Sequence, residues 1–217
     1  MLRTALGVLS VGALAGLAAC APPLAQRPMS TPTSSASGSG RVLLVYFSRA
    51  GENYYYGDRR TLDVGNTEVV ARMISDRIGC DVFRIEAADP YPADYEQTVA
   101  RNVREEQQDA RPAIAGTIPS LEDYDTIVLG SPVWNVRAPM IMWTFADAVD
   151  WSGKRVLPFV TYAVSDFGSV VDDYTKRLGA ATIGEGLAVQ GETATDATDD
   201  VARWLAHVGL DKKEAQK

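Results

Sequence analysis

Short apolar runs alternate with longer segments of helical periodicity from Arg41 to the end of the chain. Apolar runs bounded by polar or glycine-rich segments predict strands. The predicted strands cover residues 42–47, 81–85, 126–130, 155–161 and a stretch near 186–189. Five strands alternating with helices predict an α/β fold with a doubly wound parallel sheet, covered by helices on both faces.

The segments between these strands carry apolar residues at helical spacing. Gly79 closes the first predicted helix, and Asp94 is a candidate cap for a helix over 95–109 that places Tyr95, Val99 and Val103 on one face. Asp196 is a candidate cap for the last helix. The remaining predicted helices run from Pro139 to about Val149 and from Gly168-Ser169 through Leu178.

Three polar loops follow predicted strands, at residues 48–51 together with 65–68, at 131–136 and at 162–169. In open parallel sheets, ligands bind at the carboxyl ends of the strands, where the strand order reverses. The sequence therefore predicts that these three loops form one ligand site.

The first of these loops has the composition of a phosphate cradle. A strand ends at Ser48, and Gly65, Asn66 and Thr67 open a helix. The first N–H groups of a helix have no intrahelical partner and carry partial positive charge, and the hydroxyl and amide side chains add donors. The loop lacks both the lysine of nucleoside-triphosphate loops and the spaced glycines of dinucleotide loops. It therefore suits the terminal phosphate of a mononucleotide such as FMN.

The N-terminal residues have the pattern of an export signal. An apolar run from Ala5 to Leu17 is too short to span a bilayer and ends in Leu17-Ala18-Ala19-Cys20. This motif resembles the lipobox of bacterial lipoproteins, in which the cysteine is lipidated after cleavage, although an ordinary signal peptide would share most of it. The prediction is a signal peptide over 1–19, a lipidated Cys20 with a Pro/Ser/Gly-rich tether over 20–40, and one domain over 41–217.

The charge and the composition of the chain argue against three classes of function: nucleic-acid binding, metal binding and hydrolysis. The net charge of −7 argues against nucleic acid as a partner, because an acidic chain repels its phosphates. His207 is the only histidine, and Cys80 is the only cysteine besides Cys20, so no metal site is predicted. The sequence shows no nucleophile–base pair, so it predicts no catalytic residues of a hydrolase.

The chain resembles the flavodoxin family, and in particular its short bacterial flavodoxin-like members. The resemblance rests on Tyr46-Phe47-Ser48-Arg49-Ala50-Gly51 with Gly65-Asn66-Thr67-Glu68, on Gly130-Ser131-Pro132-Val133-Trp134 with Ala138-Pro139, and on Gly168-Ser169. It implies a five-stranded sheet of order 2-1-3-4-5 and noncovalent FMN binding. It also implies electron transfer or, as in related enzymes, quinone reduction.

The resemblance also implies which residues would hold FMN. The phosphate would lie against one group of residues, and two loops would flank the isoalloxazine ring. The phosphate group is Ser48, Arg49, Ala50, Gly65, Asn66 and Thr67. One ring loop contributes Pro132, Val133, Trp134, Asn135 and Val136, and the other contributes Tyr162, Ser165, Asp166, Phe167 and Gly168.

Two features depart from a plain flavodoxin. Residues 52–64 split the phosphate loop, and their Tyr54-Tyr55-Tyr56 run could form a lid over FMN, a partner surface or a hairpin packed on the protein. The second loop has one tryptophan, Trp134, which could stack on flavin or pack against the sheet edge. Asn135 could bind the flavin edge or serve a left-handed turn.

These observations predict an FMN-binding protein of electron transfer or oxidoreduction, anchored by lipid on the outer side of the cytoplasmic membrane. Its partner would be a redox protein or a quinone, and no metal or nucleic acid is expected. Two alternatives stay open: an FMN-dependent quinone or nitro-compound reductase, and a flavin-free lipoprotein that uses the same fold as a binding module.

Overall fold

The computed structural model describes residues 40–211. The predicted signal peptide, the lipidated Cys20 and the tether as far as residue 39 lie outside the described residues. Within residues 40–211, no helix is both long enough and apolar enough to cross a membrane.

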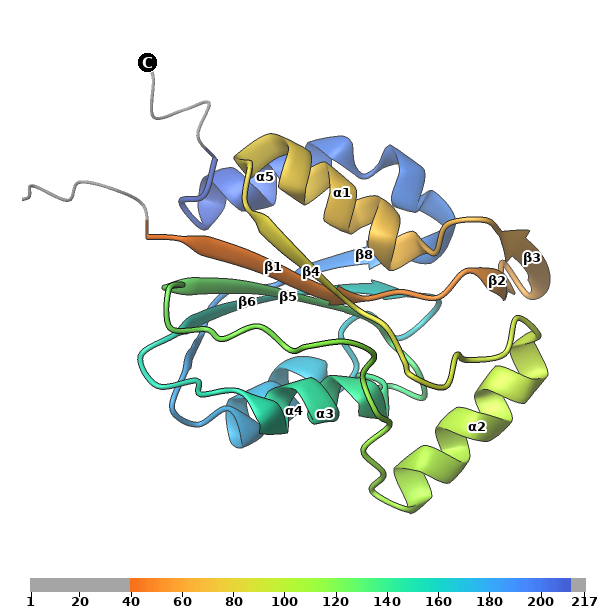
Figure 1. Cartoon of the computed structure of the whole chain (residues 1–217). Coiled ribbons are helices and arrows are strands. Elements are labelled where there is room, and N and C mark those ends of the chain that lie inside the picture. Colours follow the sequence, from red (N-terminus) through yellow and green to blue (C-terminus); the bar gives the residue numbers. More distant parts are fainter. Residues whose placement is uncertain (1–39, 212–217) are drawn as a thin grey trace, which may run out of the picture. The chain divides into compact units, whose positions relative to one another are not determined.

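The domain is built on a parallel sheet (Figure 1). Its strands are β1 (Val42–Phe47), β4 (Asp81–Ile85), β5 (Thr126–Pro132), β6 (Arg155–Tyr162), β7 (Thr182–Ile183) and β8 (Leu187–Gln190). The order is β4-β1-β5-β6-β7, with β8 also paired to β6. The five strands predicted from the sequence correspond to β1, β4, β5, β6 and β8. In that numbering the sheet has the order 2-1-3-4-5, so the predicted fold is confirmed. β7 is a short strand that the apolar pattern missed.

Helices cover both faces of this sheet (Figure 1). Helices α1 (Asn66–Ile78) and α5 (Thr198–His207) pack on one face, and α3 (Met140–Ala148) and α4 (Val170–Arg177) pack on the other. The alternation of side chains along β1 explains the two cores. Leu43, Val45 and Phe47 enter the core with α3 and α4, whereas Leu44 and Tyr46 enter the core with α1 and α5.

Pro158 lies inside β6, where the missing N–H would normally weaken a sheet. β6 pairs with β7 only at Arg155 and Val156, and it pairs with β8 from Phe159 onward. The carbonyl oxygen of Val156 accepts the N–H of Gly184, so Pro158, two residues on, faces the same side and not β5. The proline therefore stands where β6 changes partner, and its missing N–H removes no ladder bond.

The segment that splits the phosphate loop is a β-hairpin of β2 (Gly51–Tyr55) and β3 (Asp58–Leu62). Tyr55 pairs with Asp58, so Tyr56 and Gly57 form a two-residue turn in which both have positive φ, 49° and 94°. Two positive φ values match the right-handed twist of a hairpin. The hairpin considered for this segment is therefore observed, and its form is compatible with the other two roles, a lid or a partner surface.

Helix α2 (Tyr95–Gln107) begins as predicted, because the Asp94 side chain accepts a hydrogen bond from the N–H of Gln97 at 2.8 Å. Its apolar stripe points outward, since Val99 is 39% and Val103 36% exposed. The predicted cap at Asp196 is wrong. A 3₁₀ turn, η1 (Gly191–Asp196), precedes α5, and Ala197 holds the cap position without a side-chain bond.

Candidate functional site

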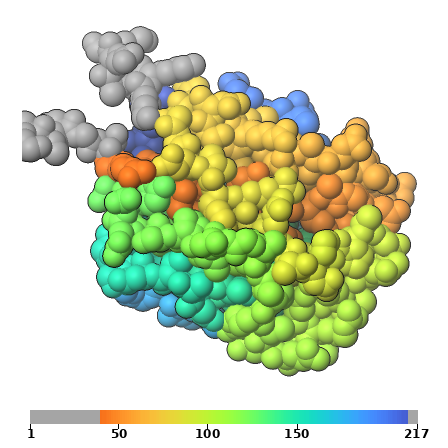
Figure 2. All heavy atoms as spheres, viewed as in Figure 1, coloured from red at the N-terminus to blue at the C-terminus, as the bar shows by residue number. Residues whose placement is uncertain are grey.

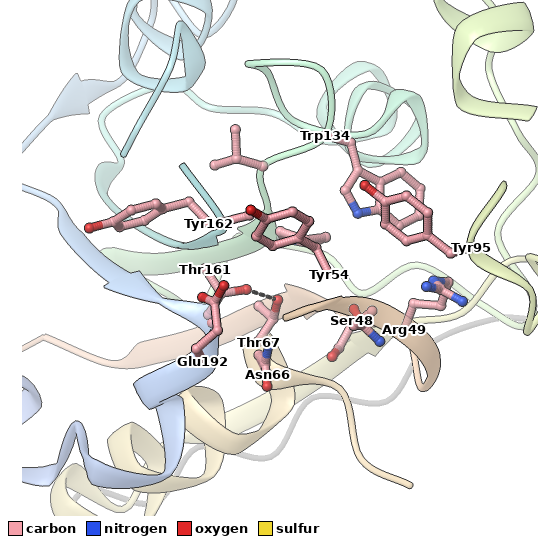
Figure 3. Close-up of a pocket in the computed structure, with 15 residues that line it drawn as sticks. Ser48, Arg49, Tyr54, Asn66, Thr67, Tyr95, Trp134, Thr161, Tyr162 and Glu192 are labelled. Atoms are coloured by element: carbon pink, nitrogen blue, oxygen red, sulfur yellow. Dashed lines mark hydrogen bonds between the residues drawn. The ribbon is translucent and has the colours of Figure 1, made fainter. Parts of the chain in front are cut away.

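A pocket lies at the carboxyl ends of β1, β5 and β6 (Figure 3). All three polar loops predicted to meet at this edge contribute to it, and so does the β2–β3 hairpin. Its lining residues are Ser48, Arg49, Asn53, Tyr54, Asn66, Thr67, Tyr95, Pro132, Val133, Trp134, Thr161, Tyr162, Ala163, Gly191 and Glu192.

The start of α1 supplies hydrogen-bond donors to this pocket. Ser48 is buried, and its Oγ accepts a hydrogen bond from the N–H of Glu68 at 3.1 Å. The N–H groups of Asn66 and Thr67 have no acceptor among residues 40–211. Such unpaired N–H groups at a helix start, with the partial positive charge of the helix dipole, form an anion site. The serine hydroxyl proton remains available to donate to an anion.

Gly65 allows the two halves of the phosphate loop to close around the intervening hairpin. A Cβ at this position would lie 2.4 Å from Ser48 Oγ and 2.4 Å from the carbonyl oxygen of Arg49. Its backbone has φ −69° and ψ 149°, which any residue can adopt. Glycine is therefore required here by the close approach of the loop and not by the backbone conformation.

Thr67 joins the helix start to the neighbouring strand. Its hydroxyl lies 2.7 Å from the hydroxyl of Thr161 at the end of β6, and both residues are buried (Figure 3). This bond holds the floor of the pocket together across α1 and the sheet.

Arg49 carries a positive charge at the pocket. Its guanidinium donates to the carbonyl oxygens of Pro92 at 2.9 Å, Ala93 at 3.1 Å and Glu52. Its Nε is buried without a partner, and no ion pair of the described residues includes it. Burial lowers the pKa of Arg49 from its usual value. A partly buried cation without a carboxylate partner favours the binding of an anion nearby.

Aromatic side chains surround the outer part of the pocket. The indole of Trp134 packs edge-on against Phe47 at 5.6 Å and Tyr91 at 5.2 Å between ring centroids, so it is anchored on the sheet edge while it lines the cavity. Tyr54, Tyr95 and Tyr162 line it as well. Aromatic faces of this kind suit a flat, conjugated ligand.

Several predicted site residues lie outside this lining. They are Ala50, Gly65, Asn135, Val136, Ser165, Asp166, Phe167 and Gly168. Asn135 and Val136 form a turn with φ values of 48° and 62°, and the Asn135 amide donates to Glu106 at 2.5 Å. The left-handed turn considered for Asn135 is therefore observed.

The outer parts of the two predicted ring loops contact each other. The carbonyl oxygen of Val136 accepts the N–H of Ser169 at 2.7 Å, and a Cβ at Gly168 would lie 2.1 Å from the same oxygen. Phe167 packs with the core on the α3 side of the sheet. Only Trp134 and Tyr162, nearer the strand ends, remain on the pocket wall with their immediate neighbours.

Sequence reasoning did not place Asn53, Tyr95, Thr161, Gly191 or Glu192 in the site. Thr161 ends a predicted strand, and that position could have identified it. Glu192 carried no such signal, yet its Oε2 is buried without a partner and its Oε1 accepts the N–H of Tyr56 at 3.1 Å.

Comparison with known proteins supports a family assignment. The family model described as Flavodoxin matches residues 62–208. A solved protein described as a flavoprotein, from Bacteroides uniformis, is 26% identical and superposes with a TM-score of 0.62 over 77% of this chain and 98% of its own. A similarly described protein from Bacteroides eggerthii is 24% identical, with a TM-score of 0.62 over 78% and 98%.

A flavoprotein from Lactobacillus acidophilus, solved in complex with FMN, is 17% identical and has a TM-score of 0.55 over 76% of this chain and 99% of its own. At that identity the similarity shows the fold alone. No curated protein sequence matches the chain significantly.

Proposed function

The chain belongs to the flavodoxin family, and from this membership we propose that it binds FMN in the pocket at the ends of β1, β5 and β6 and acts in electron transfer or oxidoreduction. The observation that carries the proposal is the start of α1, where the N–H groups of Asn66 and Thr67 and the hydroxyl of Ser48 converge. The Lactobacillus acidophilus flavoprotein, solved in complex with FMN, shows that a protein of this fold can hold this flavin.

The residues at the helix start fit a phosphate. The donors are neutral hydroxyl and N–H groups, and the partly buried Arg49 adds a positive charge beside them. Glu68, the acidic residue of the first helical turn, is held away by ion pairs with Arg72 and with Arg84, the second at 2.9 Å. Its charge is therefore compensated before an anion binds.

The aromatic wall fits the ring of a flavin. Trp134 and Tyr162, at the ends of β5 and β6, would flank the ring, and the phosphate would lie at Ser48 and Thr67. Bound FMN would supply the redox chemistry, while the residues around it would hold it and adjust its potential.

We also propose that the protein works at the outer side of the cytoplasmic membrane, attached through Cys20, and exchanges electrons with a redox protein or a quinone. Support for this part is the lipobox-like motif Leu17-Ala18-Ala19-Cys20 and the Pro/Ser/Gly-rich stretch that follows it. Mass spectrometry of the membrane fraction would test it, because a lipidated N-terminal cysteine adds a mass that Cys20→Ala abolishes.

Titration of the full-length chain in detergent with FMN, followed by quenching of flavin fluorescence, tests the binding proposal. Ser48→Ala should weaken binding roughly tenfold to a hundredfold, because a hydrogen bond to a charged group is lost. Ser75→Ala is the matched control, since Ser75 lies on the same helix and its hydroxyl bonds only to the carbonyl oxygen of Arg72. If Ser48→Ala and Ser75→Ala bound FMN with the same Kd, the phosphate would have to lie elsewhere.

One observation favours the flavin-free alternative. The pocket has a volume of about 90 Å³, whereas pockets for small organic ligands usually measure roughly 300–1,000 Å³. A chain that shows no saturable FMN binding in this titration would be a binding module with a flavodoxin fold.

A further inference from the structure

The β2–β3 hairpin lies over the flavin pocket. It pairs with no other strand of residues 40–211, and an isolated two-stranded hairpin is only marginally stable in water. Its position therefore depends on its contacts with the rest of the domain. Figure 2 shows the hairpin meeting the helix α2 region on this face of the domain.

The base of the hairpin is firmly held. Arg49 donates to the carbonyl oxygens of Pro92 and Ala93, and to that of Glu52 in the hairpin itself. The N–H of Glu52 donates to Ala93 at 2.8 Å, and the Glu52 carboxylate accepts the N–H of Tyr95 at 3.2 Å. These contacts fix the first strand where it leaves the phosphate loop.

The tip of the hairpin is held by surface contacts. Arg59 forms an ion pair with Glu96 at 3.0 Å, and its guanidinium lies 3.7 Å from the ring centroid of Tyr95. The N–H of Tyr56 donates to Glu192 at 3.1 Å. Exposed contacts of these kinds contribute little stability each. The tip is therefore held more weakly than the base.

Tyr54 connects this tip to the pocket. In the view of Figure 3 its ring lies between Trp134 and Tyr95 on one side and Tyr162 on the other, and all four line the cavity. With Tyr54 in this position the cavity has a volume of about 90 Å³. A flavin ring needs more space than this, so part of the pocket wall must move outward before the ring can enter.

We propose that the β2–β3 hairpin is the cover of the flavin pocket: its tip opens at the Arg59 and Tyr56 contacts to admit FMN and closes with Tyr54 against the bound ring. The proposal rests on the proposed FMN function and adds to it how ligand exchange is controlled. A cover that closes over both the empty and the occupied pocket slows entry and release together.

Rapid mixing of the full-length chain with FMN tests the cover. Arg59→Ala removes the ion pair and the cation–π contacts with Tyr95 and, at 6.0 Å, with Tyr54. It should raise the association and dissociation rate constants by a similar factor, roughly 3- to 30-fold, with Kd nearly unchanged. Arg60→Ala is the matched control, because it removes the same charge from the same strand, where Arg60 lies over Tyr55 and not over Tyr95. It should behave as the wild type.

Tyr54→Ala tests the contact with the ring. It should weaken FMN binding roughly two- to tenfold and leave the bound flavin more fluorescent, whereas Tyr55→Ala, outside the pocket lining, should change neither. The cover proposal would be overturned if folded Arg59→Ala protein had the same rate constants as Arg60→Ala. It would also be overturned if Tyr54→Ala bound FMN with unchanged affinity and unchanged quenching. Both results presuppose FMN binding by the wild type. Failure of all variants to bind would instead refute the proposed function, and the cover with it.

Discussion

Gly65→Ala is a direct test of the phosphate loop, because the backbone at this position would accept alanine. With φ −69° and ψ 149°, the change introduces no backbone strain. The added Cβ would meet Ser48 Oγ and the carbonyl oxygen of Arg49, each at 2.4 Å. Since one of these atoms belongs to the backbone, the loop itself must shift away from the helix start.

The magnitude follows from overpacking and capping. Overpacking of a close contact costs typically about 1–3 kcal/mol, and alanine is also a poorer residue than glycine at a helix N-cap. Alanine also restricts the unfolded chain more than glycine does, which stabilises the folded state by about 0.4–1 kcal/mol. The net loss should be about 1–3 kcal/mol, which for a domain of this size lowers Tm by roughly 2–12 °C. The shift of Ser48 should also weaken FMN binding at least tenfold.

Thermal unfolding and FMN titration of the same samples measure both effects. Gly179→Ala is the control, because a Cβ there meets nothing within 4 Å and the residue has no positive φ. Its expected effect is neutral or slightly stabilising. If Gly65→Ala matched Gly179→Ala in both Tm and affinity, the close approach of the loop to the helix start would be refuted.

Three further predictions concern stability. Thr67→Val and Thr161→Val should each lower the free energy of unfolding by about 1–3 kcal/mol, because each leaves a buried hydroxyl unpaired. In urea unfolding the double variant should lose less than the sum of the two single losses. Additive losses would contradict the shared hydrogen bond. Gly130→Ala would place a Cβ 2.0 Å from the ring of Phe159, so Tm should fall, and Phe159→Leu should restore part of the loss; a rise in Tm would refute the contact. Burial raises the pKa of Tyr91 in the folded chain, so above about pH 10 the unfolded chain loses this proton first. Stability should therefore fall as pH rises, and Tyr91→Phe should flatten that decline in urea unfolding between pH 9.5 and 11, whereas an unchanged slope would exclude the effect.

The strands and their alternation with helices were predictable from the sequence. Apolar runs such as 42–47 and 126–130 are buried on both faces of a parallel sheet, and this burial requires continuous apolar sequence. The meeting of Ser48, Asn66 and Thr67 at one pocket was predictable for a related reason. Ser48, Asn66 and Thr67 follow a strand or open a helix, so local structure alone places their donors at one edge of the sheet.

Helix α2 shows where periodicity was insufficient. Its Val99 and Val103 lie outward, while Thr98, Asn102 and Glu105 are buried. Thr98 donates to the carbonyl oxygen of Pro92 at 2.9 Å, and Glu105 accepts from Tyr91 at 2.8 Å. These partners are supplied by the loop before the helix. Periodicity identifies the two faces of a helix, but it carries no information on which face will find hydrogen-bond partners.

The sequence by itself therefore determined the sheet, its covering helices and the helix start that can hold a phosphate, because each depends on residues close in the chain. The tertiary structure alone decided that Tyr54 enters the pocket, that Glu192 meets the hairpin, and that the outer parts of the two ring loops pack on each other. These contacts join residues far apart in sequence. Their geometry depends on how the loops fold over the finished sheet, which no local pattern encodes.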